Sequence, residues 1–238
     1  MPYHILAKPE DIADRAVVVG DPGRAEYLSK FLENTKLVNE HRGLLTYTGE
    51  WRGVRVTVST HGMGGPGAAI IFEELIELGA KVLIRFGTTG GIKRGVKVGD
   101  VVIPLAAYHY PGGIFKMYVG DYCAAAVPHF DVVKALVEEA EKEGARAWVD
   151  PVFSSDGFYA ENRELVEKWA SMGAVSVEME CATLFMVARL RGVKAGAVLL
   201  VNGSHVEPVD RLILESTLEE AMERTARIAL NAVVRVPI

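Results

Sequence analysis

One local pattern constrains the fold most strongly: a short strand-like run rich in β-branched or apolar residues, followed by a glycine-rich turn. It occurs at residues 16–20, 54–59 and 82–86, and the first two copies lead into helical patterns at 25–32 and 68–78. Short runs rich in β-branched residues predict buried strands. Strands that alternate with helices predict an α/β fold with a mostly parallel or mixed sheet.

The remainder of the chain continues this alternation. Predicted strands cover 98–104, 148–154, 174–177 and 195–201, and predicted helices cover 131–143, 161–172, 178–191 and 214–233. A turn at 51–53 predicts a hairpin, whereas 108–128 is expected to be an irregular loop. A length of 238 residues fits one domain over residues 1–238. The sequence therefore predicts a three-layer αβα domain.

Composition excludes several classes of protein. The net charge of −5 does not suit a sequence-independent nucleic-acid binder, which needs a basic face. The chain lacks an apolar run near the roughly 20 residues of a membrane span and a leader-like N-terminus. We therefore expect a cytoplasmic protein with neither nucleic acid nor membrane as a partner.

The cysteine content bears on metal sites and disulfides. Cys123 and Cys181 are too few and too far apart for a disulfide framework or a zinc site, so we expect no metal. Cys123 lies in the loop-like stretch and is expected to be a free thiol. An inter-subunit disulfide is the alternative.

Arginines accompany the glycine-rich turns. Arg24 follows the first turn, Arg85 lies in the third apolar run, and Arg42 precedes Gly43. Guanidinium groups beside exposed backbone N–H groups suit a small oxyanion such as phosphate. The spacing is not that of a dinucleotide-binding fingerprint. Ordinary strand-to-helix connections with surface arginines are the alternative.

Two further groups of residues are candidates for a site. Phe158 and Tyr159 form an aromatic pair, and Glu178 and Glu180 flank Met179. Taken singly, each has an ordinary explanation, because an aromatic residue can belong to the core and glutamates at a helix start complement the helix dipole. Their order along the chain is more informative than either group alone.

In chain order the motifs are Gly-Asp-Pro-x-Arg, Arg-Gly, His-Gly-Met-Gly-Gly-Pro, Ile-Arg-x-Gly-Thr-Thr-Gly, Ser-Ser-Asp-x-Phe-Tyr and Val-Glu-Met-Glu-Cys-Ala-Thr-Leu. Nearly the whole chain resembles the hexameric nucleoside phosphorylases, which include purine nucleoside, uridine and archaeal methylthioadenosine phosphorylases. The resemblance implies a central mixed, partly barrel-like sheet. It also implies cleavage of a nucleoside by phosphate to free base and ribose 1-phosphate, with no cofactor.

The resemblance assigns a phosphate site and a shared assembly. The phosphate-binding residues would be Gly20, Arg24, Arg85, Thr88 and, from a neighbouring subunit, Arg42. Arginines clamp phosphate oxygens bidentately and can aim the anion at the sugar. Since a monomer would lack part of this site, we expect at least a dimer, and by resemblance a homohexamer built as a trimer of dimers.

The resemblance also assigns the nucleoside site. Glu180 suits the ribose 2′ and 3′ hydroxyls because a carboxylate accepts two hydrogen bonds well. Met179 would pack on the sugar, and Glu178 would be a second ribose contact. His4 would reach the 5′ end of the nucleoside across the subunit interface, and Phe158 would stack on the base.

The base site departs from the pattern of purine-specific relatives. They often carry an Asp that protonates purine N7, but Ser204 stands at that position, with Glu207 and Asp210 shortly after it. A general acid is worth roughly two to four powers of ten in rate. Asn202, as a hydrogen-bond donor, and His205, as a proton donor, are the candidates to replace it. A solvated loop position is the alternative for His205.

The sequence supports two hypotheses about which base the nucleoside carries, a purine or uracil. Val201-Asn202 resembles uridine phosphorylases, yet the Gln-x-Arg pair that they carry after the Phe-Tyr motif is missing. Phe-Tyr-Ala-Glu resembles the archaeal purine enzymes, in which case Glu161 would accept from a purine N–H; a helix-start charge is its alternative role. We predict purine nucleosides, with inosine and guanosine favoured over adenosine and methylthioadenosine undecided. Uridine phosphorylase is the alternative; a nucleosidase or a non-catalytic nucleoside-binding protein is more distant.

Overall fold

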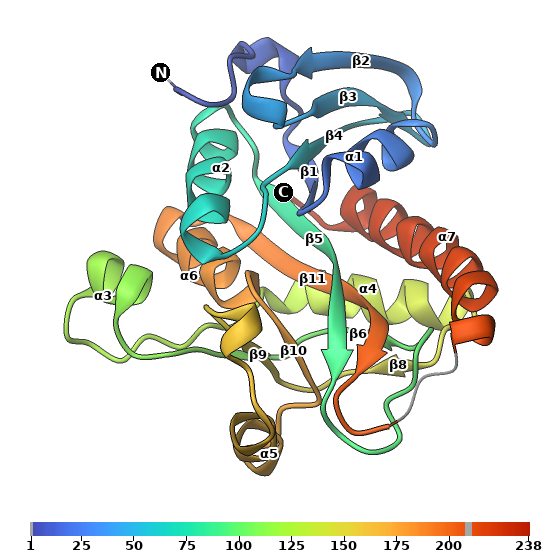
Figure 1. Cartoon of the computed structure of the whole chain (residues 1–238). Coiled ribbons are helices and arrows are strands. Elements are labelled where there is room, and N and C mark those ends of the chain that lie inside the picture. Colours follow the sequence, from blue (N-terminus) through green and yellow to red (C-terminus); the bar gives the residue numbers. More distant parts are fainter. Residues whose placement is uncertain (1, 208–210) are drawn as a thin grey trace.

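The computed structural model describes residues 2–207 and 211–238. Its described part contains one mixed sheet, covered by helices on both sides (Figure 1). The strands are β1 (Arg15–Val19), β2 (Glu33–Asn39), β3 (Thr46–Trp51), β4 (Val54–Thr60), β5 (Val82–Gly91), β6 (Val101–Val102), β7 (Ala107–Tyr108), β8 (Ala147–Trp148), β9 (Val152–Ser154), β10 (Ser176–Glu178) and β11 (Lys194–Ser204). The α-helices are α1 (Pro22–Ser29), α2 (Gly65–Glu77), α3 (Gly113–Val119), α4 (Phe130–Lys142), α5 (Arg163–Ser171), α6 (Cys181–Arg191) and α7 (Arg211–Arg235).

The sheet branches at β5. The main path runs β2-β3-β4-β1-β5-β10-β9-β7, while β11 pairs with β5 and β6, and β6 with β8. The first half of β5 lies parallel to β1 and the end of β5 lies antiparallel to β10, with β11 parallel along its length. Since β5 exchanges one neighbour for another along its length, its central residues lie where two parts of the sheet diverge.

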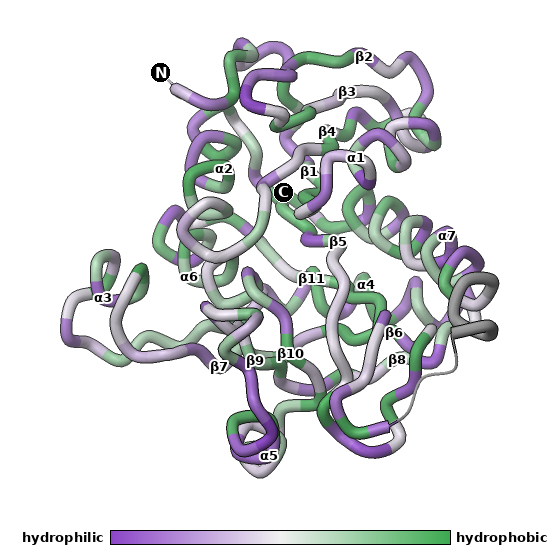
Figure 2. The backbone as a smooth tube through the Cα atoms, viewed as in Figure 1, coloured by the Kyte–Doolittle hydropathy of each residue, from purple (hydrophilic) through white to green (hydrophobic). Residues whose placement is uncertain are grey.

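Alternating side chains of the strands build two separate cores. Val17 and Val19 of β1 pack with residues of α1, α4 and α7, whereas Ala16 and Val18 pack with α2 and α6. Successive side chains of a strand point to opposite faces of the sheet. In Figure 2, α2 and α7 alternate between hydrophobic and hydrophilic residues along their turns, as helices with one buried side do. The predicted three-layer arrangement around a mixed sheet is confirmed.

Local signals explain where several helices begin. In α1, Pro22 is the first residue and the Asp21 side chain accepts from the N–H of Gly23 at 2.8 Å. The helix predicted to start at residue 161 starts at Arg163, because Asn162 is the cap and accepts from Leu165 N–H at 3.0 Å.

Three expectations from the sequence were wrong in detail. The stretch 108–128 is not wholly irregular, since it contains α3. The single strand predicted over 148–154 is two strands, β8 and β9. β8 pairs with β6, whereas β9 pairs with β7 and β10. Pro151, between the two strands, has no N–H to donate. The polar, largely exposed β2 was not predicted; its pairing with β3 decides its structure.

None of the helices in the described residues is long and apolar enough to cross a bilayer.

Candidate active site

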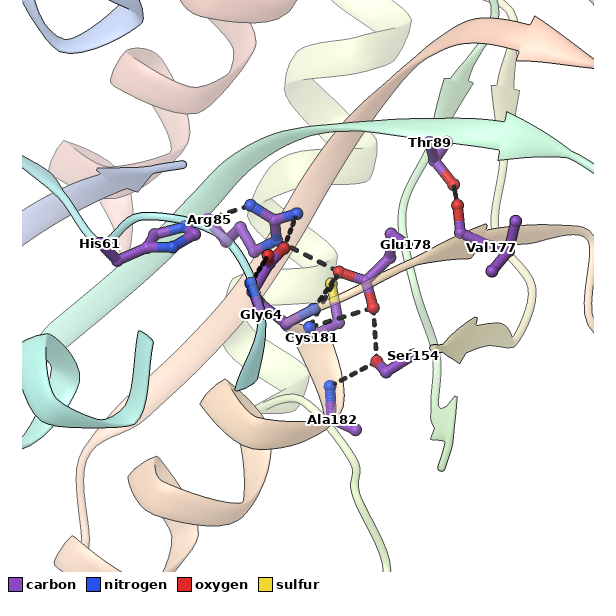
Figure 3. A network of polar contacts seen from close by, with 10 residues as sticks. His61, Gly64, Arg85, Thr89, Ser154, Val177, Glu178, Cys181 and Ala182 are labelled. Carbon is purple, nitrogen blue, oxygen red and sulfur yellow. Dashed lines mark hydrogen bonds and ion pairs between the residues drawn. The ribbon is translucent and has the colours of Figure 1, made fainter. Parts of the chain in front are cut away.

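Arg85 is the centre of a buried polar network at the point where the sheet diverges (Figure 3). Arg85 lies in the middle of β5, and its side chain is only 5% exposed. The guanidinium donates from Nη2 to Glu180 Oε2 at 2.5 Å, from Nε to Glu178 Oε2 at 3.3 Å and from Nη1 to His61 Nε2 at 3.1 Å. The second carboxylate oxygen of Glu180 accepts from the backbone N–H of Gly64 at 2.6 Å. One cation thus joins β5 to the turn after β4 and to the start of α6.

Glu178 is saturated by groups of the protein itself. It accepts from the Ser154 hydroxyl, from Glu180 N–H at 2.8 Å and from Cys181 N–H at 2.9 Å, in addition to Arg85. Its side chain is fully buried. Glu178 therefore satisfies free N–H groups at the start of α6 and holds the Arg85 side chain in place.

The charges of the network depend on each other. Burial opposes the charge of Arg85, but Glu180 and Glu178 raise the pKa of its guanidinium above the ordinary value. Burial raises the pKa of Glu180, and the neighbouring Glu178 carboxylate adds to the effect. Burial and the Arg85 charge lower the pKa of Arg24. Two cations close enough to disfavour each other make a site that an anion would stabilise.

Besides Arg85, three predicted phosphate-binding residues lie on or next to β1, α1 and β5. Gly20 directly follows β1, beside the turn that follows β4. Arg24 lies in the first turn of α1, with its guanidinium 5.4 Å from the centre of the Phe86 ring. Thr88 lies three residues after Arg85 in the same strand, β5.

Apart from His4, the predicted nucleoside-binding residues divide into two groups. Glu180 and Glu178 are in the Arg85 network, and Met179 lies between them, partly buried. Phe158 is 63% exposed in a 3-10 turn over residues 158–160. Glu161 follows that turn, and its carboxylate lies 3.8 Å from Nε2 of His205.

His205 and its neighbours occupy the loop after β11. A Cβ atom on Gly90 would lie 2.8 Å from Nε2 of His205, so the imidazole rests directly on the glycine backbone of β5. Ser204, at the expected Asp position, accepts from the N–H groups of Val206 and Glu207 at 3.2 and 2.9 Å. Its hydroxyl is thus occupied in shaping the loop.

Asn202, Glu207 and Asp210 are the remaining polar candidates near this loop. Asn202 is exposed at an irregularity where β11 shifts its register against β5. Glu207 accepts from the N–H of Gly95 at 2.9 Å and so fixes the loop to the turn after β5. Asp210 lies outside the described residues. Of the candidates in this part of the chain, His205 is the one that faces another candidate, Glu161.

Two candidates lie apart from the network. Arg42 is exposed in the 3-10 turn His41–Gly43, with a φ of 57°. His4 is held by Glu74 of α2: His4 Nδ1 lies 2.7 Å from Glu74 Oε1. The same carboxylate accepts from the backbone N–H groups of Tyr3 and Ile5 at 2.9 and 2.7 Å. With Nδ1 facing the carboxylate, the Nε2 atom is left for another partner.

The Glu74 contacts give a first testable prediction. Burial would raise the pKa of Glu74, but the His4 side chain and the backbone N–H groups outweigh it and lower the pKa below the usual value of a glutamate. A carboxyl group with a lowered folded pKa stabilises the fold above its unfolded pKa and loses that effect as the pH falls through the folded value. Relative to an unstructured peptide at the same pH, the amides of residues 3–5 should therefore be strongly protected from exchange near neutral pH and lose that protection as the pH falls below the usual range of a carboxyl group.

In the variant Glu74→Ala these amides should have little protection relative to an unstructured peptide at every pH, because the acceptor is removed. Exchange measured by mass spectrometry on the N-terminal peptide checks this. Glu73→Ala on the same helix is the matched control, since Glu73 pairs with Arg191 instead. Strong protection of these amides in Glu74→Ala would contradict the anchoring role.

Sequence reasoning missed three residues of this region. His61, Ser154 and Glu74 each contact a candidate directly. The first two occur inside the His-Gly-Met-Gly-Gly-Pro and Ser-Ser-Asp-x-Phe-Tyr motifs, which was the available signal. Glu74 had no such signal, because the pattern places Glu73, Glu74 and Glu77 together on the solvent side of a helix. The cysteines are both free within the described chain, Cys123 exposed and Cys181 buried beside Glu178.

Known proteins of one family are similar to this chain over most of its length. Residues 14–235 match the model of the family described as "Phosphorylase superfamily". The chain is 33% identical to a guanosine phosphorylase of Halorubrum lacusprofundi, over 97% of each chain. It is 37% identical to a DeoD-type purine nucleoside phosphorylase of Clostridium perfringens, over 98% of this chain and 99% of the relative. It is also 36% identical to a uridine phosphorylase of Thermococcus kodakarensis, over 87% and 78%.

Proposed function

Because this chain belongs to the phosphorylase superfamily, we propose that it cleaves purine nucleosides with phosphate to give free base and ribose 1-phosphate. The observation that carries the proposal is the contact between Arg85 and Glu180. It places a phosphate-binding type of side chain 2.5 Å from a ribose-binding type. A nucleophile and the sugar that it attacks must be held within contact distance, and this pair can hold both.

Each part of the network has a role in this reaction. Arg24, Arg85, Thr88 and the N–H of Gly20 bind phosphate, and Glu180 accepts from the ribose hydroxyls. The sugar becomes cation-like as its bond to the base breaks, and the bound phosphate dianion stabilises that charge. Glu178, whose carboxylate is already saturated by protein donors, supports Arg85 more directly than it contacts ribose. Met179 packs on the sugar.

The base lies toward Phe158, Glu161, Asn202 and His205 in this proposal. His205 faces Glu161 at 3.8 Å, so a carboxylate acceptor and an imidazole lie together where the base would leave. This pair suits a 6-oxopurine, which offers an N–H donor and an N7 acceptor. His205 replaces the missing Asp as proton donor, and Asn202 is the alternative.

Self-association completes the site. His4 and Arg42 lie apart from the Arg85 network within one chain, which supports their contribution to a neighbouring subunit. We propose a homohexamer, a trimer of dimers, in which each phosphate site receives a partner's arginine. The reaction needs no metal or organic cofactor, and a cytoplasmic location suits its substrates.

The test is release of free base from inosine, guanosine, adenosine, methylthioadenosine and uridine, each with and without phosphate. We expect phosphate-dependent cleavage, fastest for inosine and guanosine. Cleavage of uridine alone would favour the second candidate, uridine phosphorylase, which the Thermococcus kodakarensis relative and the Val201-Asn202 pair support. Cleavage without phosphate would indicate a nucleosidase, and binding without turnover a nucleoside-binding protein. Full activity of a monomer at nanomolar dilution would contradict the shared site.

A further inference from the structure

His61 is a buried histidine to which the roles above give no function. It directly follows β4 and is 1% exposed. Its backbone N–H donates to the carbonyl of Val19 at 2.7 Å, which fixes it to the end of β1. In Figure 3 its ring points toward the guanidinium of Arg85.

The His61 side chain reaches Arg85 across the end of an intervening strand. β1 lies between β4 and β5, and Val18 of β1 pairs with Ser59 on one side and with Arg85 on the other. A Cβ atom on Gly20, the residue after β1, would lie 3.1 Å from the Gly62 carbonyl oxygen and 3.6 Å from Cε1 of His61. The glycine at this position therefore leaves room for the Gly62 backbone, and the His61 ring passes it at ordinary contact distance.

The ring is a neutral acceptor. Arg85 Nη1 lies 3.1 Å from Nε2, and a guanidinium can only donate, so Nε2 has no proton and Nδ1 carries it. Burial and the Arg85 charge hold the pKa of His61 well below its usual value, with Arg24 acting in the same direction. The edge of the ring packs on Phe72 with 5.3 Å between centroids. Nδ1 has no hydrogen-bond partner in the part of the chain that the structure describes.

The guanidinium of Arg85 depends on these partners for its orientation. It lies directly over its own strand, where a Cβ atom on Gly87 would come within 2.7 Å of Cζ. On the side of Gly87 the guanidinium therefore faces only the backbone of β5. The hydrogen bonds to His61, Glu178 and Glu180 set the plane of the guanidinium. If Glu180 turns to ribose, two anchors remain, His61 on one edge and Glu178 on the other.

We propose that His61 is a positioning residue that fixes the Arg85 guanidinium for phosphate binding by accepting a hydrogen bond from Nη1 across the end of β1. This inference rests on the proposed function, because it assumes that Arg85 binds phosphate. His61 itself neither touches phosphate nor transfers a proton. The site requires residue 61 to place a hydrogen-bond acceptor at the position of Nε2.

A matched pair of amides tests the proposal. Glutamine at position 61 can place its oxygen near the position of Nε2, whereas asparagine is one methylene too short. Binding of inorganic phosphate to the full chain is measured by titration calorimetry, and folding by thermal unfolding. We expect the Kd for phosphate to rise about tenfold to a hundredfold in His61→Asn, since hydrogen bonds to charged groups are the stronger ones. His61→Gln should stay within about threefold of the unmodified protein.

Three controls separate positioning from other roles. Phe72→Leu loosens the packing under the ring without removing an acceptor and should leave phosphate affinity nearly unchanged. His61→Leu, which also lacks an acceptor, replaces the asparagine variant if that variant does not fold. The pH dependence of phosphate binding in His61→Gln should match that of the unmodified protein between about pH 6 and pH 8, because a neutral ring adds no ionisation.

The outcomes separate this inference from the proposed function. Absence of phosphate binding in the unmodified protein would overturn the proposed function. Normal phosphate binding in the unmodified protein together with equal affinities in the asparagine and glutamine variants would overturn only the role of His61. A pH limb lost in His61→Gln would also overturn it, since the ring would then titrate.

Discussion

Glu180→Gln is expected to lower kcat/KM for the nucleoside about a hundredfold to ten-thousandfold while leaving phosphate binding intact. In the proposed function this carboxylate accepts from both ribose hydroxyls, and each hydrogen bond to a charged acceptor contributes about 1.5–3 kcal/mol. The amide of glutamine accepts through one oxygen only and has no charge. Steady-state kinetics with inosine and calorimetry with inorganic phosphate check the two halves of this expectation.

The contact with Arg85 sharpens this prediction. In the unmodified protein, Glu180 binds Arg85 Nη2 at 2.5 Å, so part of the guanidinium is occupied by a carboxylate. Removing the Glu180 charge should leave the Kd for phosphate equal to that of the unmodified protein or lower it. Glu73→Gln, which alters an exposed ion pair with Arg191, is the matched control and should leave both quantities unchanged. A Glu180→Gln protein that loses phosphate affinity as strongly as nucleoside turnover would contradict the division of labour between the two side chains.

Arg85→Met is expected to abolish phosphate binding and to destabilise the fold. It leaves Glu178 and Glu180 buried without their cation, and breaking a buried ion pair by removing one partner costs about 3–5 kcal/mol. For a chain of this size, that corresponds to a fall in Tm of about 10 °C. Differential scanning calorimetry and phosphate titration measure the two effects separately.

The pH dependence of the Arg85→Met protein follows from the same pair. Burial already raises the pKa of Glu180, and Arg85 opposes that effect. Without the arginine the Glu180 pKa rises further, so protonation of this carboxyl group stabilises the fold and the loss is greatest at neutral pH. The deficit in Tm should shrink as the pH falls toward about 5. The double variant Arg85→Met/Glu178→Gln should recover part of the Tm but none of the phosphate binding.

A surface arginine provides the control. Arg163 binds Glu167 at 2.7 Å on the exposed side of α5, and Arg163→Met should change Tm by little, since exposed ion pairs contribute at most about 1 kcal/mol. An Arg85→Met protein as stable as Arg163→Met would mean that the buried carboxylates do not depend on Arg85.

Much of the architecture could be predicted from local pattern. The β-branched runs at β1, β4 and β5, and the periodic apolar residues of α4 and α7, specify their structure through side-chain periodicity. Prediction was wrong where the strand with which a segment pairs, rather than the segment's own residues, decides its structure. The polar β2 is a strand because β3 pairs with it, and the chain around Pro151 changes partners within a few residues.

The sequence by itself determined which chemical groups are present: the arginines, the glutamates flanking Met179, and the glycines at strand ends. Only the tertiary structure decided how they are paired. Arg85, Glu180 and His61 are far apart in the chain. They meet because β4, β1, β5 and β10 are successive neighbours in the sheet, and Glu180 lies two residues after the end of β10. The direction of a hydrogen bond or the burial of a charge depends on such distant neighbours. No short stretch of sequence contains that information.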